Sequence, residues 1–123
     1  MKKILIVDDE NDIVETIKFV LEAQGYSCIC AYDGEKGLKL AKDKMPDLMI
    51  LDVMMPNING FKICRLLKFD VKYKNIPIIM LTARSQNEDK LIGEETGADI
   101  YMTKPFDIEE LVNNVKNLCP VES

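Results

Sequence analysis

Hydrophobic residues occur along the chain in two alternating patterns, short continuous runs and longer segments with helical spacing. Continuous runs such as residues 4–7 and 48–51 are typical of strands that are covered on both faces. They predict strands at 2–7, 27–31, 47–51, 77–81 and 100–103. Apolar residues spaced three or four apart predict helices at 12–24, at 33–44, after a turn at 57–60, at 88–96 and at 107–118.

Several residues are predicted to start, stop or bury these helices. Asp12 and Asp107 are candidate caps at two helix starts, and Gly25 and Gly97 are typical of helix ends. The apolar stripe of the first helix is predicted to contain Ile13, Ile17, Val20 and Leu21. The stripe of the third contains Phe61, Cys64, Leu67 and, if the helix extends that far, Val71.

Five strands that alternate with five helices through short loops indicate an α/β fold with a doubly wound parallel sheet. At 123 residues the chain has the usual size of one domain. We therefore expect a single domain over residues 1–119, with residues 120–123 as a frayed end.

Four of the predicted strands lead into a reactive polar residue. Asp8 and Asp9 follow the first strand, Asp52 ends the third, Thr82 follows the fourth and Lys104 follows the fifth. Because the carboxyl ends of parallel strands share one edge of a sheet, these side chains are expected to meet there. Three carboxylates and one ammonium sum to about −2, which one divalent cation would neutralise. The pattern indicates metal binding and phosphoryl transfer.

The amino-acid composition disfavours several classes of function and of site. The net charge of −5 disfavours direct binding of nucleic acid, whose phosphates select basic faces. The chain contains no histidine, which disfavours a zinc site and excludes Ser-His or Cys-His catalysis and a phosphohistidine on this chain. The four cysteines form no C-x-x-C pair and are expected to be reduced. With no signal peptide or membrane-spanning run, a cytoplasmic location is expected.

Five separated motifs resemble those of the two-component response-regulator receiver domain. They are Val7-Asp8-Asp9-Glu10, Leu51-Asp52-Val53-Met54-Met55-Pro56, Gly60, Leu81-Thr82-Ala83 and Lys104-Pro105-Phe106, in this order. The resemblance extends from residue 2 to about residue 118. It implies a flavodoxin-like sheet with strand order 2-1-3-4-5.

The resemblance also implies a role for each residue of the acidic cluster. Asp52 resembles the phosphoacceptor, while Asp8 and Asp9 resemble the pair that organises Mg²⁺ or Mn²⁺, together with Asp52 and the backbone carbonyl of Met54. Magnesium prefers such oxygen ligands in octahedral geometry. The alternative from the residues alone is that these aspartates cap turns or helices, although Asp12 would cap the first helix better.

Three further residues resemble those that respond to phosphorylation in this family. Thr82 resembles the switch hydroxyl, Lys104 the cation that pairs with the phosphate or with Asp52, and Tyr101 the aromatic ring that moves with Thr82. The resemblance implies a cis Lys104–Pro105 peptide bond. The alternatives are a helix cap for Thr82, a solvated strand end for Lys104 and an amphipathic ring at a strand edge for Tyr101. Arg84 is expected to flank the phosphoryl pocket.

The implied function is a phosphorylation-activated signalling switch. A histidine kinase or phosphotransfer protein donates the phosphoryl group, and a surface of the 88–96 helix, the fifth strand and the last helix then binds an unknown effector. Such a protein is no enzyme beyond self-phosphorylation and slow self-dephosphorylation. The alternatives are an unphosphorylated pseudo-receiver, an aspartyl-phosphate hydrolase, which would need a second carboxylate where Met54 stands, and a flavodoxin-like cofactor binder.

Two positions depart from the pattern of receivers that dimerise in winged-helix regulators. Those receivers usually carry an acid where this chain has Ile100 and an arginine where it has Asn114. The departures favour a monomer or a weak phosphorylation-dependent dimer. The sequence leaves open whether an effector domain follows residue 123 in the parent protein.

Overall fold

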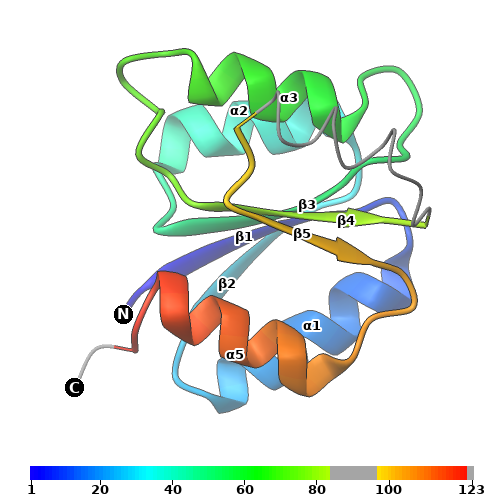
Figure 1. Ribbon diagram of the computed structural model, residues 1–123, viewed down its shortest axis with the longest axis vertical. Helices are drawn as coiled ribbons and strands as arrows, with labels where there is room; N and C mark the ends of the chain where they lie inside the picture. The colour runs from blue at the N-terminus through cyan, green and yellow to red at the C-terminus, as the bar shows by residue number, and fades with distance from the viewer. Residues whose placement is uncertain (84–96, 122–123) are drawn as a thin grey trace.

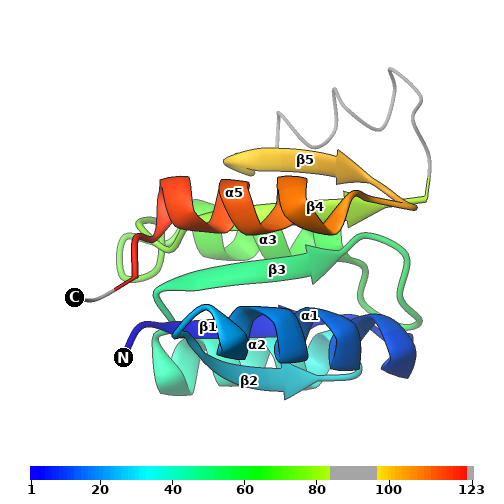
Figure 2. The ribbon, with the colours of Figure 1, turned by 90° about the horizontal axis from the view of Figure 1, so that it is seen from below.

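The computed structural model describes residues 1–83 and 97–121, and these residues contain one parallel sheet. Its strand order is β2-β1-β3-β4-β5, as the resemblance implied (Figures 1 and 2). The strands are β1 (Lys3–Val7), β2 (Ser27–Ala31), β3 (Leu48–Asp52), β4 (Ile78–Thr82) and β5 (Ile100–Thr103). The prediction of a doubly wound α/β fold is therefore confirmed.

Helices cover both faces of the sheet. In Figure 1, α2 (Gly34–Lys44) and α3 (Gly60–Lys68) lie above it, and α1 (Asn11–Ala23) and α5 (Ile108–Leu118) lie below it. The predicted 88–96 helix and Arg84 lie outside the described residues. No helix within the described part of the chain is long and apolar enough to cross a membrane.

The core has two layers because successive side chains of a strand point to opposite faces. Leu5 and Val7 of β1 pack with α2 and α3, whereas Ile4 and Ile6 pack with α1 and α5. All five residues of β3 and of β4 are buried. The continuous apolar runs thus reflect central strands with helices on both sides.

Three helices begin at a capping side chain. Asp33, Asn59 and Asp107 accept hydrogen bonds from the backbone N–H groups of residues 36, 62 and 109, at 2.8, 3.0 and 2.8 Å. Such caps satisfy donors that a helix start leaves unpaired. The prediction that Asp107 caps the last helix is confirmed.

The start of α1 differs from the prediction. The helix begins at Asn11 with Glu10 in the cap position, so that Asp12 lies in its first turn and is not the cap. The reason is a local hydrogen bond: the backbone N–H of Glu10 donates to Asp8 Oδ1 at 2.9 Å, two residues earlier in the chain. The carboxylate of Asp8 therefore sets the geometry of the turn before the helix.

The predicted apolar stripes are partly wrong. In α1 the fully buried residues are Val14, Ile17 and Leu21, while Ile13 and Val20 are half-buried. The third helix ends at Lys68, and Val71 beyond it is 83% exposed. A small rotation of a helix about its own axis buries one residue and exposes its neighbour, and periodicity alone does not determine the angle of rotation.

The register of the strands brings their carboxyl ends level. Val7 is aligned with Leu51, Asp52 with Leu81, and Thr82 with Thr103. Asp8, Asp52, Thr82 and Lys104 consequently leave the sheet along one edge.

Candidate functional site

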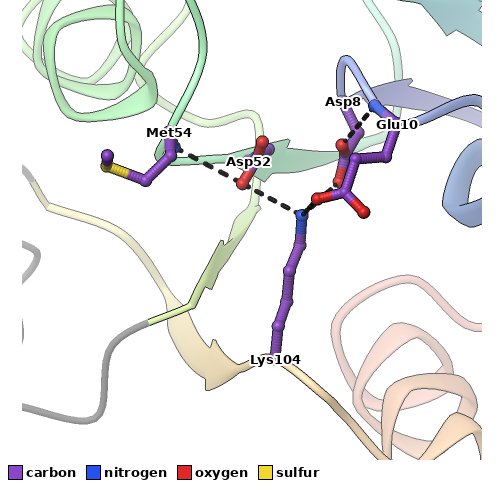
Figure 3. Close-up of polar contacts among 5 residues, drawn as sticks. All are labelled: Asp8, Glu10, Asp52, Met54 and Lys104. Atoms are coloured by element: carbon purple, nitrogen blue, oxygen red, sulfur yellow. Dashed lines mark hydrogen bonds and ion pairs between the residues drawn. The ribbon is translucent and has the colours of Figure 1, made fainter.

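Two aspartates and one lysine meet at the carboxyl edge of the sheet (Figure 3). Lys104 Nζ lies 2.8 Å from Asp8 Oδ2 and 3.2 Å from Asp52 Oδ1. The side chains of Asp8, Asp52 and Lys104 are 1%, 3% and 11% exposed. The centre of the site is a buried group of two carboxylates that share one ammonium.

The strands position these three residues directly. Asp52 is the last residue of β3, and Asp8 and Lys104 each follow the last residue of a strand. The backbone N–H of Lys104 donates to the carbonyl oxygen of Thr82, which extends the pairing of β4 and β5 by one step. The Lys104–Pro105 peptide bond is cis, as the resemblance implied.

The electrostatics of the group favour a further positive charge. Burial, followed by the negative charge of Asp8, raises the pKa of Asp52 to about 6, although Lys104 acts in the opposite direction. Burial also raises the pKa of Asp8. Burial lowers the pKa of Lys104, but its contacts with Asp8 and Asp52 outweigh this, and the net shift is upward. One lysine therefore does not compensate two buried carboxylates.

The acidic residues beside this group form a possible cation site. Carboxylate oxygens of Asp8, Asp9 and Glu10 lie within 4.8 Å of one another. Asp8 is buried, whereas Asp9 and Glu10 are exposed, so the cluster opens toward solvent. Oxygen donors on one side and room for water on the other match the preference of Mg²⁺ for carboxylates and several waters. The residues present thus fit the ion that the sequence predicted.

Two of the predicted ligands lie close to this cluster. Asp52 is joined to Asp8 through Lys104. Met54 lies two residues after Asp52 in the chain, and its backbone N–H donates a 3.4 Å hydrogen bond to Asp52 Oδ1. Its side chain is 53% exposed. That the Met54 carbonyl binds a metal stays a prediction.

Glu10 is a site residue that the sequence reasoning missed. Its Oε1 lies 3.4 Å from Lys104 Nζ, and its side chain is 60% exposed. The signal was the third acid of the Asp8-Asp9-Glu10 run. Its contact with Lys104 depends on where α1 begins, and α1 begins at Asn11, one residue before the predicted start.

Thr82 and Tyr101 lie on the same face of neighbouring strands. Tyr101 is aligned with Met80, two residues before Thr82, and side chains two apart in a strand point the same way. Thr82 is 1% exposed. Tyr101 is half-buried and packs against the core layer under α2 and α3. This placement is compatible with a coupled movement of the two side chains, which stays a prediction.

Comparisons with known proteins agree with this geometry. The family model of the response regulator receiver domain matches residues 4–116. The chain is 45% identical over 118 residues to the DNA-binding dual master transcriptional regulator RpaA of Synechocystis sp., covering 96% of this chain and 49% of RpaA. It is 48% identical over 115 residues to the alkaline phosphatase synthesis transcriptional regulatory protein PhoP of Bacillus subtilis, covering 94% and 47%. The chain thus spans about half the length of these curated relatives.

A solved structure shows the same fold. The response regulator TrrA of Thermotoga maritima, in complex with Mg²⁺-BeF, is 40% identical, with a TM-score of 0.85 over 96% of this chain and 99% of that one. The family match covers most of the chain, and the motifs that carry it lie at the buried carboxylate group. The chain belongs to the response regulator receiver domain family of two-component systems.

Proposed function

We propose that the chain is a phosphorylation-dependent switch in which Asp52 accepts a phosphoryl group. The observation that carries the proposal is the position of Asp52, buried at a strand end and 3.2 Å from Lys104, beside an acidic cluster. With a pKa of about 6, Asp52 is mostly ionised at neutral pH. A carboxylate in this state is a competent nucleophile.

The reaction transfers a phosphoryl group from a histidine of a sensor kinase or phosphotransfer protein. An oxygen of Asp52 donates its electron pair to phosphorus, and the new O–P bond forms as the N–P bond to the donor breaks. The imidazole nitrogen keeps the electron pair of that bond. Lys104 stays within reach of both Asp52 and the new phosphate oxygens, because it contacts Asp52 before the transfer.

We propose that Asp8, Asp9, Asp52 and the Met54 carbonyl hold Mg²⁺, with Mn²⁺ as an alternative ion. When bound, the cation neutralises excess negative charge among the carboxylates and the transferring phosphoryl group. The open side at Asp9 leaves room for the donor. The Mg²⁺-BeF complex of the related TrrA supports this assignment.

The proposed signal is a change in partner binding. The phosphoryl group adds roughly one negative charge and new acceptor oxygens beside Thr82 and Lys104. Thr82 and Lys104 move to contact it, and Tyr101, on the same face as Thr82, moves with them. The output surface is expected at β5, α5 and residues 88–96, with a monomer or a weak dimer as the phosphorylated form.

Catalysis by the chain is limited to its own phosphorylation and slow dephosphorylation, and the proposed location is the cytoplasm. RpaA and PhoP are transcriptional regulators by name and about twice as long as the matched part. We propose that here, too, the switch controls an effector, either attached in a longer parent protein or separate, without direct contact between this domain and nucleic acid.

Intact-mass measurement tests the phosphoacceptor. The protein is incubated with acetyl phosphate or phosphoramidate in the presence of Mg²⁺, and one phosphoryl adduct is expected. The adduct should be absent in Asp52→Asn and after chelation, but present in Asp12→Asn, which changes an exposed aspartate near the same edge. No adduct with either donor would favour the pseudo-receiver, and an adduct that persists in Asp52→Asn would show that another residue is the phosphoacceptor.

A further inference from the structure

A shallow groove of about 760 Å³ lies at the C-terminal end of α3. We call it the α3 groove, and it is lined by Lys62, Arg65, Leu66, Phe69, Asp70 and Val71. In Figure 1, α3 runs from the carboxyl edge of the sheet, at the right, to the opposite edge. Most of the α3 groove therefore lies toward the other end of the sheet from Asp52, and nothing in the proposed phosphoryl transfer requires its residues.

Apolar side chains are unusually exposed in this groove. Leu66 is 46%, Phe69 71% and Val71 83% exposed. Single exposed hydrophobic residues are ordinary on protein surfaces, but several that line one concavity indicate a contact site. None of the three supports the core, because α3 turns Ile63, Cys64 and Leu67 toward the sheet instead.

Positive charge is concentrated around the same residues. Residues 62–74 contain five lysines and arginines and one aspartate, in a chain whose net charge is −5. Lys68 is directed inward, where it pairs with Asp99 at 2.8 Å. Arg65 lies over the ring of Phe69 at 5.8 Å, and Lys72 lies over the ring of Tyr73 at 5.5 Å. The cations thus lie directly beside the apolar surface.

We propose that the α3 groove binds a segment of another protein in which an aromatic or aliphatic side chain is flanked by acidic residues. The apolar side chain would occupy the concavity between Leu66, Phe69 and Val71, and the carboxylates would pair with Lys62 and Arg65. Charge complementarity with a locally basic face selects an acidic partner. A buried apolar anchor with a charged rim is the usual anatomy of such contacts.

The other possible occupants fit less well. A nucleic acid would satisfy the charges but would offer little to bury three aliphatic and aromatic side chains. A second copy related by a two-fold axis would bring the same basic patch against itself. A lipid surface is flat on this scale, whereas the α3 groove is concave.

Peptide selection tests the proposal without assuming a particular partner. A phage-displayed library of random peptides is selected on the unphosphorylated protein and counter-selected on the double variant Phe69→Ser/Val71→Ser. We expect the enriched peptides to contain an aromatic or aliphatic residue flanked by Asp or Glu. Enriched peptides without this pattern, or no enrichment over the counter-selected variant, would overturn the proposal.

Binding of one selected peptide, followed by fluorescence anisotropy, assigns the contact to individual residues. Phe69→Ser/Val71→Ser and the charge reversal Lys62→Glu/Arg65→Glu should each weaken binding by about tenfold or more. Phe19→Ser, which changes a 77% exposed phenylalanine on α1, is the matched control and should leave the affinity unchanged. All substituted positions are exposed or on the groove rim, and circular dichroism checks that each variant is folded.

Two further measurements separate the rival occupants. Co-sedimentation with phosphatidylcholine–phosphatidylserine vesicles that is lost in Phe69→Ser/Val71→Ser would assign the α3 groove to a lipid surface and overturn the proposal. Concentration-dependent dimerisation in analytical ultracentrifugation that is lost in the same variant would assign it to a second copy and overturn it equally. Because Asp52 is untouched in every variant, a failure here is distinct from a failure of the phosphorylation test.

Discussion

Lys104 is the residue on which the electrostatics of the site depend. Its Nζ is shared between Asp8 at 2.8 Å, Asp52 at 3.2 Å and the exposed Glu10 at 3.4 Å. Two buried carboxylates with one counter-charge cost free energy, because burial penalises each charge and the like charges repel. Asp52 bears most of this cost, and its raised pKa of about 6 is the measurable sign.

Asp52→Asn is expected to stabilise the protein at neutral pH in the absence of divalent ions. The folded-state pKa of Asp52, about 6, lies above the ordinary value of 3.8, so its stabilising contribution is complete below pH 4 and is lost as the pH rises through about 6. Asparagine carries no such loss. The free energy of unfolding of the variant should therefore exceed that of the wild type above pH 6, by up to about 3 kcal/mol. Urea unfolding at a series of pH values measures this gap.

The gap should close as the pH falls from 6 to 4, because folded wild-type Asp52 then binds a proton that the unfolded chain binds only near the ordinary pKa of 3.8. Part of this difference in the free energy of unfolding arises from the charge of Asp8, which raises the pKa of Asp52. In an Asp8→Asn background the advantage of Asp52→Asn above pH 6 should consequently be smaller, which a double-mutant cycle detects. A gap that is constant over the whole pH range would contradict this account.

At the scale of elements, the close approach of α3 to the end of β3 holds Asp52 in place. The backbone N–H of Gly60, the first residue of α3, donates a 3.0 Å hydrogen bond to the carbonyl of Val53. A Cβ atom at Gly60 would lie only 2.2 Å from the carbonyl oxygen of Asp52. The start of the helix therefore packs on the backbone that carries the phosphoacceptor, and only glycine allows this distance.

Gly60→Ala is expected to lower both stability and phosphorylation. The added methyl group must push α3 and β3 apart, which typically costs about 1–3 kcal/mol. The same displacement moves the Asp52 carboxylate relative to Lys104 and Asp8. The initial rate of adduct formation with acetyl phosphate, measured by intact mass, should fall by about tenfold or more, because small misplacements of reacting groups are costly.

The control for this variant is Gly25→Ala. Gly25 has a φ of +103°, so alanine is strained there, and it precedes β2 at the sheet edge opposite the site. Gly25→Ala should lose stability and keep the phosphorylation rate under folding conditions. Equal loss of rate in both variants would show that the effect of Gly60→Ala is general destabilisation rather than displacement of Asp52.

Comparison of the predicted and observed elements shows which signals are local. The strand runs and the cap at Asp107 were predicted, because continuous apolar residues require cover on both faces and a capping side chain bonds to its own helix. The end of α3 before Val71 and the start of α1 at Asn11 were not readable. Apolar periodicity does not contain either boundary, and the start of α1 follows a local hydrogen bond from the Glu10 N–H to Asp8.

Some features of the site could be predicted from the sequence, and others required the structure. Parallel strands of known order oblige Asp8, Asp52, Thr82 and Lys104 to share an edge, and the sequence predicted this meeting. Only the side-chain geometry of the structure shows that Lys104 contacts three carboxylates and that Glu10 is one of them. The α3 groove was likewise hidden, since it depends on Phe69 and Val71 falling just beyond the end of the helix.

At the scale of the whole molecule, the two ends of the sheet have different chemistry. The carboxyl edge is acidic, with Asp8, Asp9 and Glu10 in one cluster. The opposite end carries the basic α3 groove on an otherwise acidic chain. A cation bound at the carboxyl edge interacts with the folded chain alone, because the unfolded chain does not bring the strand ends together. Cation binding and folding are therefore linked.

Magnesium is expected to stabilise the folded protein through this linkage. At ten times the dissociation constant, one site adds about 1.4 kcal/mol to the free energy of unfolding, provided that the unfolded chain does not bind. The measurement is urea unfolding at increasing MgCl₂, with ionic strength held constant by NaCl so that general screening does not contribute. Asp9→Asn and Asp8→Asn should lose most of the gain, because both are proposed ligands.

Glu10→Gln separates the proposed ligand set from the general acidity of the edge. Glu10 lies in the same cluster but is proposed as a partner of Lys104 rather than as a ligand. Glu10→Gln should therefore keep most of the magnesium gain, although it removes the same unit of charge as Asp9→Asn. If both variants lost the gain equally, the edge would attract Mg²⁺ only as a diffuse negative patch. Retention in Glu10→Gln with loss in Asp9→Asn would instead require direct coordination, since the two variants have the same net charge.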